Sequence, residues 1–203
     1  SYTADMQVPD ALSVAVWEDS VAILSETTLS LSTLSPLGTW EVVAYKDLAQ
    51  QNIPADTPLL MAYRDDMVVL IANKLIENEN DGYTIYAYTV ETSQDTVPQN
   101  TATPIVPVPV TVAVDVVIEG EGEEQTEILR VVTGSGGDDD TPNQLDIYQA
   151  IGINEGHPLT YFSSLSVPDD KWEGHSDQDV FCSSVDMVNG ELAVLVSLGG
   201  EWC

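Results

Sequence analysis

A ten-residue pattern that occurs twice constrains the fold of this chain more than any other feature of its sequence. The first copy, AVWEDSVAIL, covers residues 15–24, and the second, AYRDDMVVLI, covers residues 62–71. In both copies, apolar residues stand on either side of a short acidic turn, which is typical of a β-hairpin. A repeated hairpin predicts that the chain is built from repeated antiparallel sheets.

The sequence around the first copy predicts four short strands. Residues 28–34 alternate strictly, with Leu29 and Leu31 on one face and Ser30 and Ser32 on the other. A period of two is the signature of a strand with one buried face. Neighbouring runs are rich in β-branched and aromatic residues, and turn residues separate them. The expected strands lie at 12–17, 20–25, 28–34 and 39–45.

The same arrangement recurs along the chain, and signals for helices are nearly absent. The second group of expected strands is 58–63, 66–75, 82–92 and a proline-containing edge strand at 104–108. The third is 110–118, 126–134, 144–152 and 159–166, and an incomplete fourth is 179–187 and 190–198. The sequence therefore predicts an all-β fold with repeat units at 12–57, 58–109, 110–166 and 179–203.

Repeated sheets of four antiparallel strands resemble the blades of β-propellers. No Trp-Asp dipeptide of the WD40 type accompanies this resemblance. The resemblance implies a propeller-like fold of four-stranded blades, and a β-sandwich is the alternative. Because known propellers have at least four blades, three and a half units predict either a fragment of a longer polypeptide or an assembly of two chains.

The charge balance of the chain excludes some classes of binding partner. The chain has 34 acidic residues against five basic ones, a formal charge of -29, which repels phosphate backbones and anionic membrane surfaces. We therefore exclude nucleic-acid binding, and the lack of a long apolar run excludes membrane insertion. An extracellular or cell-surface location suits this charge, because divalent cations neutralise acidic loops there. The alternative is the cytoplasm of a salt-adapted organism, where salt screens the self-repulsion.

One acidic loop has the composition of a calcium site. The segment GSGGDDDTPNQLD, residues 134–146, carries Asp138, Asp140, Asn143 and Asp146. These side chains supply the hard oxygen ligands that calcium prefers, and the glycines before them permit tight bending. Pro142 interrupts the spacing of known calcium loops. The segment predicts a calcium site, and a solvated loop without a cation is the alternative.

No motif points to catalysis. The sequence lacks Gly-x-Ser-x-Gly, phosphate-binding glycine loops and the ligand spacing of zinc sites around His157 and His175. We therefore expect a non-enzymatic binding or assembly module that takes a protein partner or self-associates. The alternative is a fragment of a carbohydrate-active enzyme, with paired carboxylates in a propeller cleft and aromatic residues such as Tyr86 and Tyr88 stacking on sugar. Whether Cys182 and Cys203, the only cysteines, form a disulfide is left open.

Overall fold

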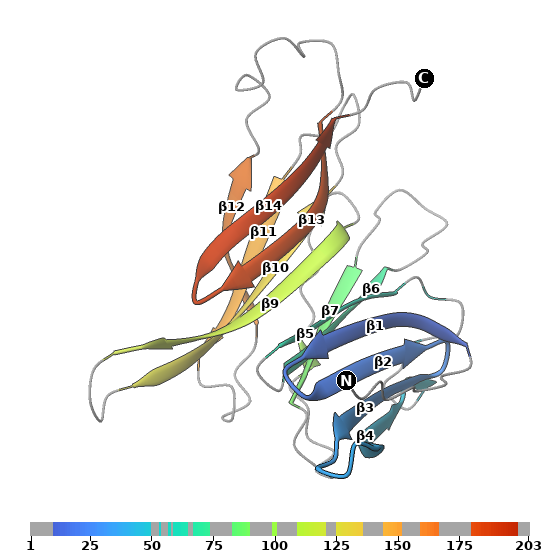
Figure 1. Ribbon diagram of the computed structural model, residues 1–203. Helices are drawn as coiled ribbons and strands as arrows, with labels where there is room; N and C mark the ends of the chain where they lie inside the picture. Colours follow the sequence, from blue (N-terminus) through green and yellow to red (C-terminus); the bar gives the residue numbers. More distant parts are fainter. Residues whose placement is uncertain are drawn as a thin grey trace.

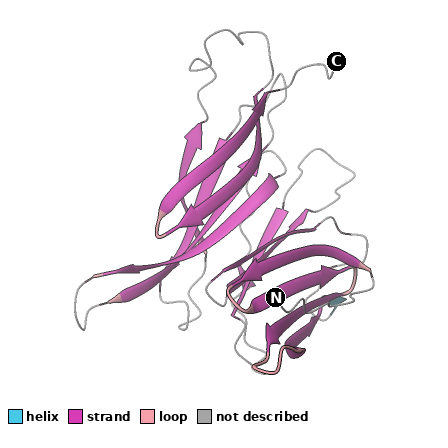
Figure 2. Ribbon diagram, in the orientation of Figure 1, coloured by secondary structure: helices cyan, strands magenta, loops and turns pink. Residues whose placement is uncertain are grey.

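The computed structural model describes residues 10–49, 53, 57, 59–64, 67–73, 83–89, 99–100, 109–120, 125–135, 144–151, 159–166 and 180–198. Strands make up nearly all of these residues (Figure 2). The described residues contain no α-helix, and their one helical position is a 3-10 turn at Ala49. Within this part of the chain, no helix has the length and apolar character needed to cross a membrane. The predicted all-β fold class is confirmed.

Within the described residues, the strands form three four-stranded sheets and one hairpin, and every neighbouring pair is antiparallel. The strands follow one another in each sheet in chain order, so each strand pairs with its neighbours in the sequence. The first sheet contains β1 (Ala11–Trp17), β2 (Ser20–Ser25), β3 (Thr28–Leu34) and β4 (Trp40–Asp47). The second contains β5 (Leu59–Arg64), β6 (Met67–Asn73), β7 (Tyr83–Thr89) and β8 (Gln99–Asn100). The third contains β9 (Pro109–Glu119), β10 (Thr126–Ser135), β11 (Gln144–Ile151) and β12 (Thr160–Ser166). The fourth sheet is the hairpin of β13 (Val180–Val188) and β14 (Glu191–Leu198).

One strand differs from the prediction. The fourth strand of the second sheet is β8, which pairs with Ile85 and Tyr86 of β7. It lies in the polar stretch between the expected strands at 82–92 and 104–108, where the sequence predicts no strand. The expected edge strand at 104–108 lies outside the described residues. An edge strand of two residues needs only backbone hydrogen bonds, so its polar side chains give no apolar signal.

Consecutive sheets pack face to face around three apolar cores. Alternate residues of the repeated hairpin pack into different cores. Leu70 of β6 faces the first sheet, whereas Val69 and Ile71 face the third. A third core joins the third sheet to the hairpin through Val132 and Val185, among others. Central strands therefore bury both faces, which explains why β6 reads as an unbroken apolar run.

The first strands of the four sheets lie next to one another. β1 contacts β5, β5 contacts β9, and β9 contacts β13. Figure 1 shows the sheets following one another from β1–β4, in blue, to β13–β14, in red. First strands gathered at one side, with later strands farther out, give the four-stranded sheets the arrangement of propeller blades.

Candidate functional site

The predicted calcium loop is only partly within the described residues. Asp138, Asp140 and Asn143 lie outside them. Asp146 lies on β11, where it pairs in register with Thr133 and Ser164, and its Oδ1 accepts a hydrogen bond 2.5 Å long from Gln144 Nε2. Within the described part of the chain, no three histidine, cysteine or acidic side chains are grouped as they would be around a metal ion. Calcium binding at this loop stays a prediction.

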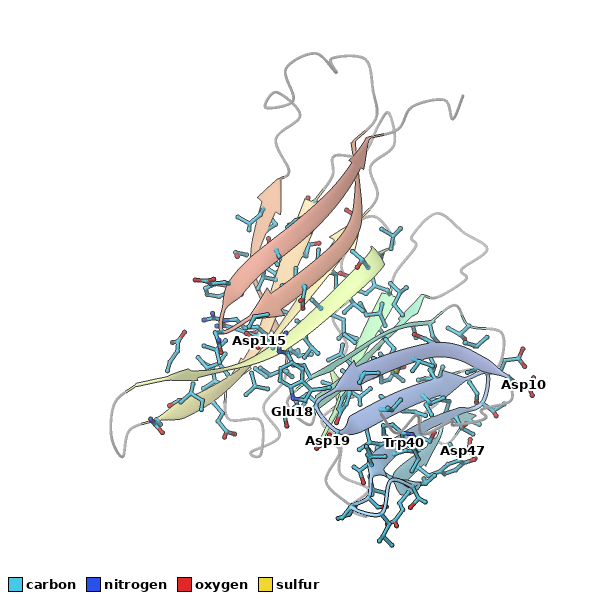
Figure 3. The ribbon with its side chains drawn as sticks, viewed as in Figure 1. Asp10, Glu18, Asp19, Trp40, Asp47 and Asp115 are labelled. Atoms are coloured by element: carbon cyan, nitrogen blue, oxygen red, sulfur yellow. The ribbon has the colours of Figure 1, made fainter. Side chains whose placement is uncertain are left out.

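The aromatic and acidic candidates do not converge on one site where they are described. Tyr86, one of the two rings predicted to stack on sugar, packs in part against the core between the first and second sheets. The side chain of the other, Tyr88, lies outside the description. Sugar stacking by these rings stays a prediction. Asp10, Glu18 and Asp19 are exposed and lie at opposite ends of β1 (Figure 3). His157, His175 and Cys203 lie outside the described residues.

A charged cluster joins all four sheets at their first strands. Arg64, at the end of β5, has Nε 3.5 Å from Asp115 Oδ1 on β9. Its Nη1 donates a 2.6 Å hydrogen bond to the carbonyl oxygen of Met187 and lies 3.4 Å from Asp186 Oδ1, both on β13. The guanidinium carbon lies 4.2 Å from the ring centroid of Trp17, the last residue of β1. We call Trp17, Arg64, Asp115 and Asp186 the Arg64 cluster.

Asp115 is the most deeply buried charge of this cluster. It lies midway along β9 (Figure 3), and its side chain is 2% exposed. Its Oδ2 accepts a 2.8 Å hydrogen bond from the backbone N–H of Gly190, in the turn between β13 and β14. Both oxygens are therefore occupied by groups from other sheets, and a buried carboxylate of this kind fixes the position of its partners.

The sequence contains two signals for this cluster, although neither belongs to a known catalytic or binding motif. Asp115 is the single charge within the apolar run VTVAVDVVI, and an isolated charge there needs a partner. Trp17 and Arg64 occupy the same position in the two copies of the repeated hairpin. Their stacking shows that this position faces the neighbouring sheet.

A second buried polar network joins the second and third sheets. The hydroxyl oxygens of Tyr83 and Tyr148 are 2.7 Å apart, and that of Tyr83 is 3.2 Å from Thr133 Oγ1. Burial raises the pKa of Tyr83 and that of Tyr148 above the ordinary value of 10. Both side chains are therefore neutral near physiological pH, and the network satisfies buried hydroxyls without offering an acid or a base.

The exposed surface contains an apolar row on β1. Leu12, Val14 and Val16 alternate along this strand, and Val14 and Val16 are 55% and 63% exposed. We call these three residues the β1 strip. In the repeated hairpin, the residue equivalent to Val16 is Tyr63, which is 6% exposed because it packs toward the first sheet. The β1 strip thus has the position and chemistry of a sheet-to-sheet contact, but no described residue of this chain covers it.

Comparisons with known proteins give little beyond this geometry. No protein-family model matches the chain, and no curated protein matches it. A solved structure, the crystal structure of the N-terminal domain of Nup159, is similar to it with a TM-score of 0.46 and 14% sequence identity. The similarity covers 95% of this chain and 53% of that chain. The chain thus spans about half the length of the solved structure that it matches.

Proposed function

We propose that this protein is a non-enzymatic interaction module that binds a partner protein through the β1 strip. The main observation in its support is that equivalent side chains on the first strands of consecutive sheets differ in burial. Met61 and Tyr63 on β5 pack against the first sheet, and Val114 on β9 packs against the second. The corresponding side chains of β1 are exposed. Apolar side chains in a row gain free energy when another apolar surface removes them from water.

The Arg64 cluster supports this proposal because it holds the strip in place. Trp17 follows Val16 directly in β1, and its ring stacks on a guanidinium that is bound to the third and fourth sheets. A surface that is ordered before binding loses less conformational entropy when a partner docks. The strip is thus part of a preorganised surface, as expected for a binding module.

The acidic surface supports an extracellular or cell-surface location, and the salt-adapted cytoplasm is the alternative. In either setting, a charge of -29 selects against acidic partners and favours basic ones. Scattered carboxylates such as Asp10 and Glu18 support a binding role over the paired-carboxylate chemistry of a glycosidase.

Site-specific photo-cross-linking tests the proposal. A benzophenone amino acid replaces Val14 in one variant and Leu37, an exposed residue in the turn between β3 and β4, in the control. We expect a discrete adduct from position 14 in extracts of the source organism, no adduct from position 37, and loss of the adduct on Val16→Asp. An adduct of twice the chain mass would identify a second copy as the partner. Equal adducts from both positions, or none from position 14, would exclude the β1 strip as a binding surface.

A further inference from the structure

The outer edge of β14 differs from the same edge in the other three sheets. The second strand of each of those sheets is paired on both sides, as β2 is by β1 and β3. In the described part of the chain, β14 pairs only with β13. Its outer edge therefore presents a row of backbone N–H and C=O groups at the place where a third strand lies in the other sheets.

The turn before β14 shows which of its amides point outward. Asn189 and Gly190 have φ angles of 51° and 78°, which is the backbone of a two-residue type I′ turn. Such a turn closes on a hydrogen-bonded pair, here Val188 with Glu191. Because N–H direction alternates along an antiparallel ladder, the N–H groups of Leu192, Val194 and Val196 point away from β13.

This edge lacks the features that protect the other outer edges from pairing. β4 carries a bulge at Val43 as well as charged residues, β12 carries a bulge at Phe162, and β8 has two residues. Bulges, charges and short length all oppose the addition of another strand. By contrast, β14 is eight residues long, ELAVLVSL, with a charge only at Glu191 and no proline. The extra residue in its own pairing, Ser183, belongs to β13.

Apolar surface lies beneath the position of an added strand. Leu145 of β11 is buried under the hairpin, where it packs in one cluster with Val185 and Met187. Leu165 of β12 pairs with Leu145 in register, so both side chains lie on the same face of the third sheet. Leu165 is nevertheless 48% exposed. The apolar interface between the third sheet and the hairpin thus continues beyond β14.

Charge selects among the segments that could add to this edge. Glu191 of β14 is exposed, on the face of the hairpin opposite Val185 and Leu192, which pack against the third sheet. A second copy of this chain carries the same charge of -29 and is repelled. Basic side chains on the outward side of an added strand are attracted to Glu191 and to the net negative charge of the chain.

We infer that the free edge of β14 binds an extended segment of a partner protein, in which apolar residues facing the third sheet alternate with basic residues facing outward. The segment adds to the hairpin as its third strand. Main-chain hydrogen bonds to β14 supply affinity, and the contact with Leu165 selects for alternation. This surface is separate from the β1 strip, so either proposal can fail without the other.

Amide exchange measured by NMR on the isotope-labelled chain tests this inference. The probe is an eight-residue blocked peptide in which valine alternates with lysine and threonine, and the control is a scrambled peptide of the same composition. We expect the alternating peptide to slow exchange of the Leu192, Val194 and Val196 amides about tenfold or more, because each gains a hydrogen bond. The Ala193 amide, already bonded to β13, should change little.

Two matched variants locate the peptide. Leu165→Ser should weaken binding of the alternating peptide about tenfold, since it removes apolar surface beneath the added strand. Val16→Ser, in the β1 strip, should leave binding unchanged. Equal protection of the β14 amides by the scrambled peptide would show that charge attraction alone slows their exchange, and would overturn the inference. It is also overturned by no protection at β14, by equal loss of binding in both variants, or by protection of these amides through self-association without peptide.

Discussion

The Arg64 cluster and the Tyr83–Tyr148 pair both place polar groups between packed sheets, but one network is charged and the other is neutral. The charged network sits where the first strands of four sheets meet, and it contains a carboxylate that is 2% exposed. The neutral network lies in the core between the second and third sheets and contains only hydroxyl groups. The two networks differ in how many sheets they join and in how they respond to the loss of one member.

The difference shows how each network contributes to the fold. A buried ion pair gains little net stability, because desolvation of the charges offsets their attraction. Its partners must nevertheless meet in one geometry, so the Arg64 cluster specifies how the sheets are placed around their first strands. Hydroxyl pairs have a smaller desolvation cost and a weaker demand on geometry. The tyrosine pair therefore adds stability to a contact that apolar packing already defines.

Removal of Asp115 should have the largest effect. Asp115→Ala leaves the Arg64 guanidinium without its buried partner and the Gly190 N–H without its acceptor. We expect a loss of about 3–5 kcal/mol in the free energy of unfolding, because a mostly buried guanidinium loses its buried counter-charge and a backbone N–H loses its acceptor. Urea denaturation measures this loss. Asp115→Asn keeps an acceptor for Gly190 and should lose less; a loss below about 1 kcal/mol for the alanine variant would show that the cluster is solvated.

Removal of one tyrosine hydroxyl should have an intermediate effect. Tyr83→Phe keeps the buried ring but deprives Tyr148 and Thr133 of their shared partner. We expect a loss of about 1–3 kcal/mol, the cost of leaving buried hydroxyls unsatisfied. Tyr45→Phe, at an exposed position of β4, is the matched control and should unfold as the unaltered protein does. Equal stability of the two variants would mean that the hydroxyl network contributes nothing.

Alkaline pH should separate the two networks further. Burial raises the pKa of Tyr83 and Tyr148 above 10 in the folded protein, so the unfolded chain loses these protons first. Below pH 10 both states are protonated and the stabilisation is complete. Above it, stability should fall by about 1.4 kcal/mol per pH unit for each such tyrosine, until the folded protein also ionises. In urea titrations between pH 9 and 11, Tyr148→Phe should show a shallower decline; parallel declines would contradict the assignment.

The strands that form the apolar cores were easier to predict from the sequence than the Arg64 cluster. Strict alternation of Leu29 and Leu31 with serines predicted β3, and the repeated hairpin predicted β1, β2, β5 and β6 within one or two residues of their observed bounds. These elements could be predicted because burial of one face imposes a period of two on the sequence. The short strand β8 could not, since its pairing depends on backbone groups that every residue carries.

The Arg64 cluster could not be assembled from sequence, because its members are far apart in the chain. Arg64 and Asp186 are 122 positions apart, and only the packing of four sheets brings them together. The isolated charge of Asp115 indicated that some partner exists, but not which of the five basic residues it is. The calcium prediction at Asp138, Asp140 and Asn143 depended on composition alone, and the structure does not describe these residues.

Asp186 provides the smallest effect and the sharpest test of whether burial decides the role of a charge. It contacts the same guanidinium as Asp115, but its side chain is 69% exposed, and it also accepts a hydrogen bond from the Met187 N–H. Water can solvate Arg64 from this side when the carboxylate is lost, so Asp186→Ala should cost only about 0–1 kcal/mol. The same urea titration that measures Asp115→Ala measures this variant. A cost as large as that of Asp115→Ala would mean that both carboxylates act as one buried unit, and the distinction between an internal and an exposed partner would fail.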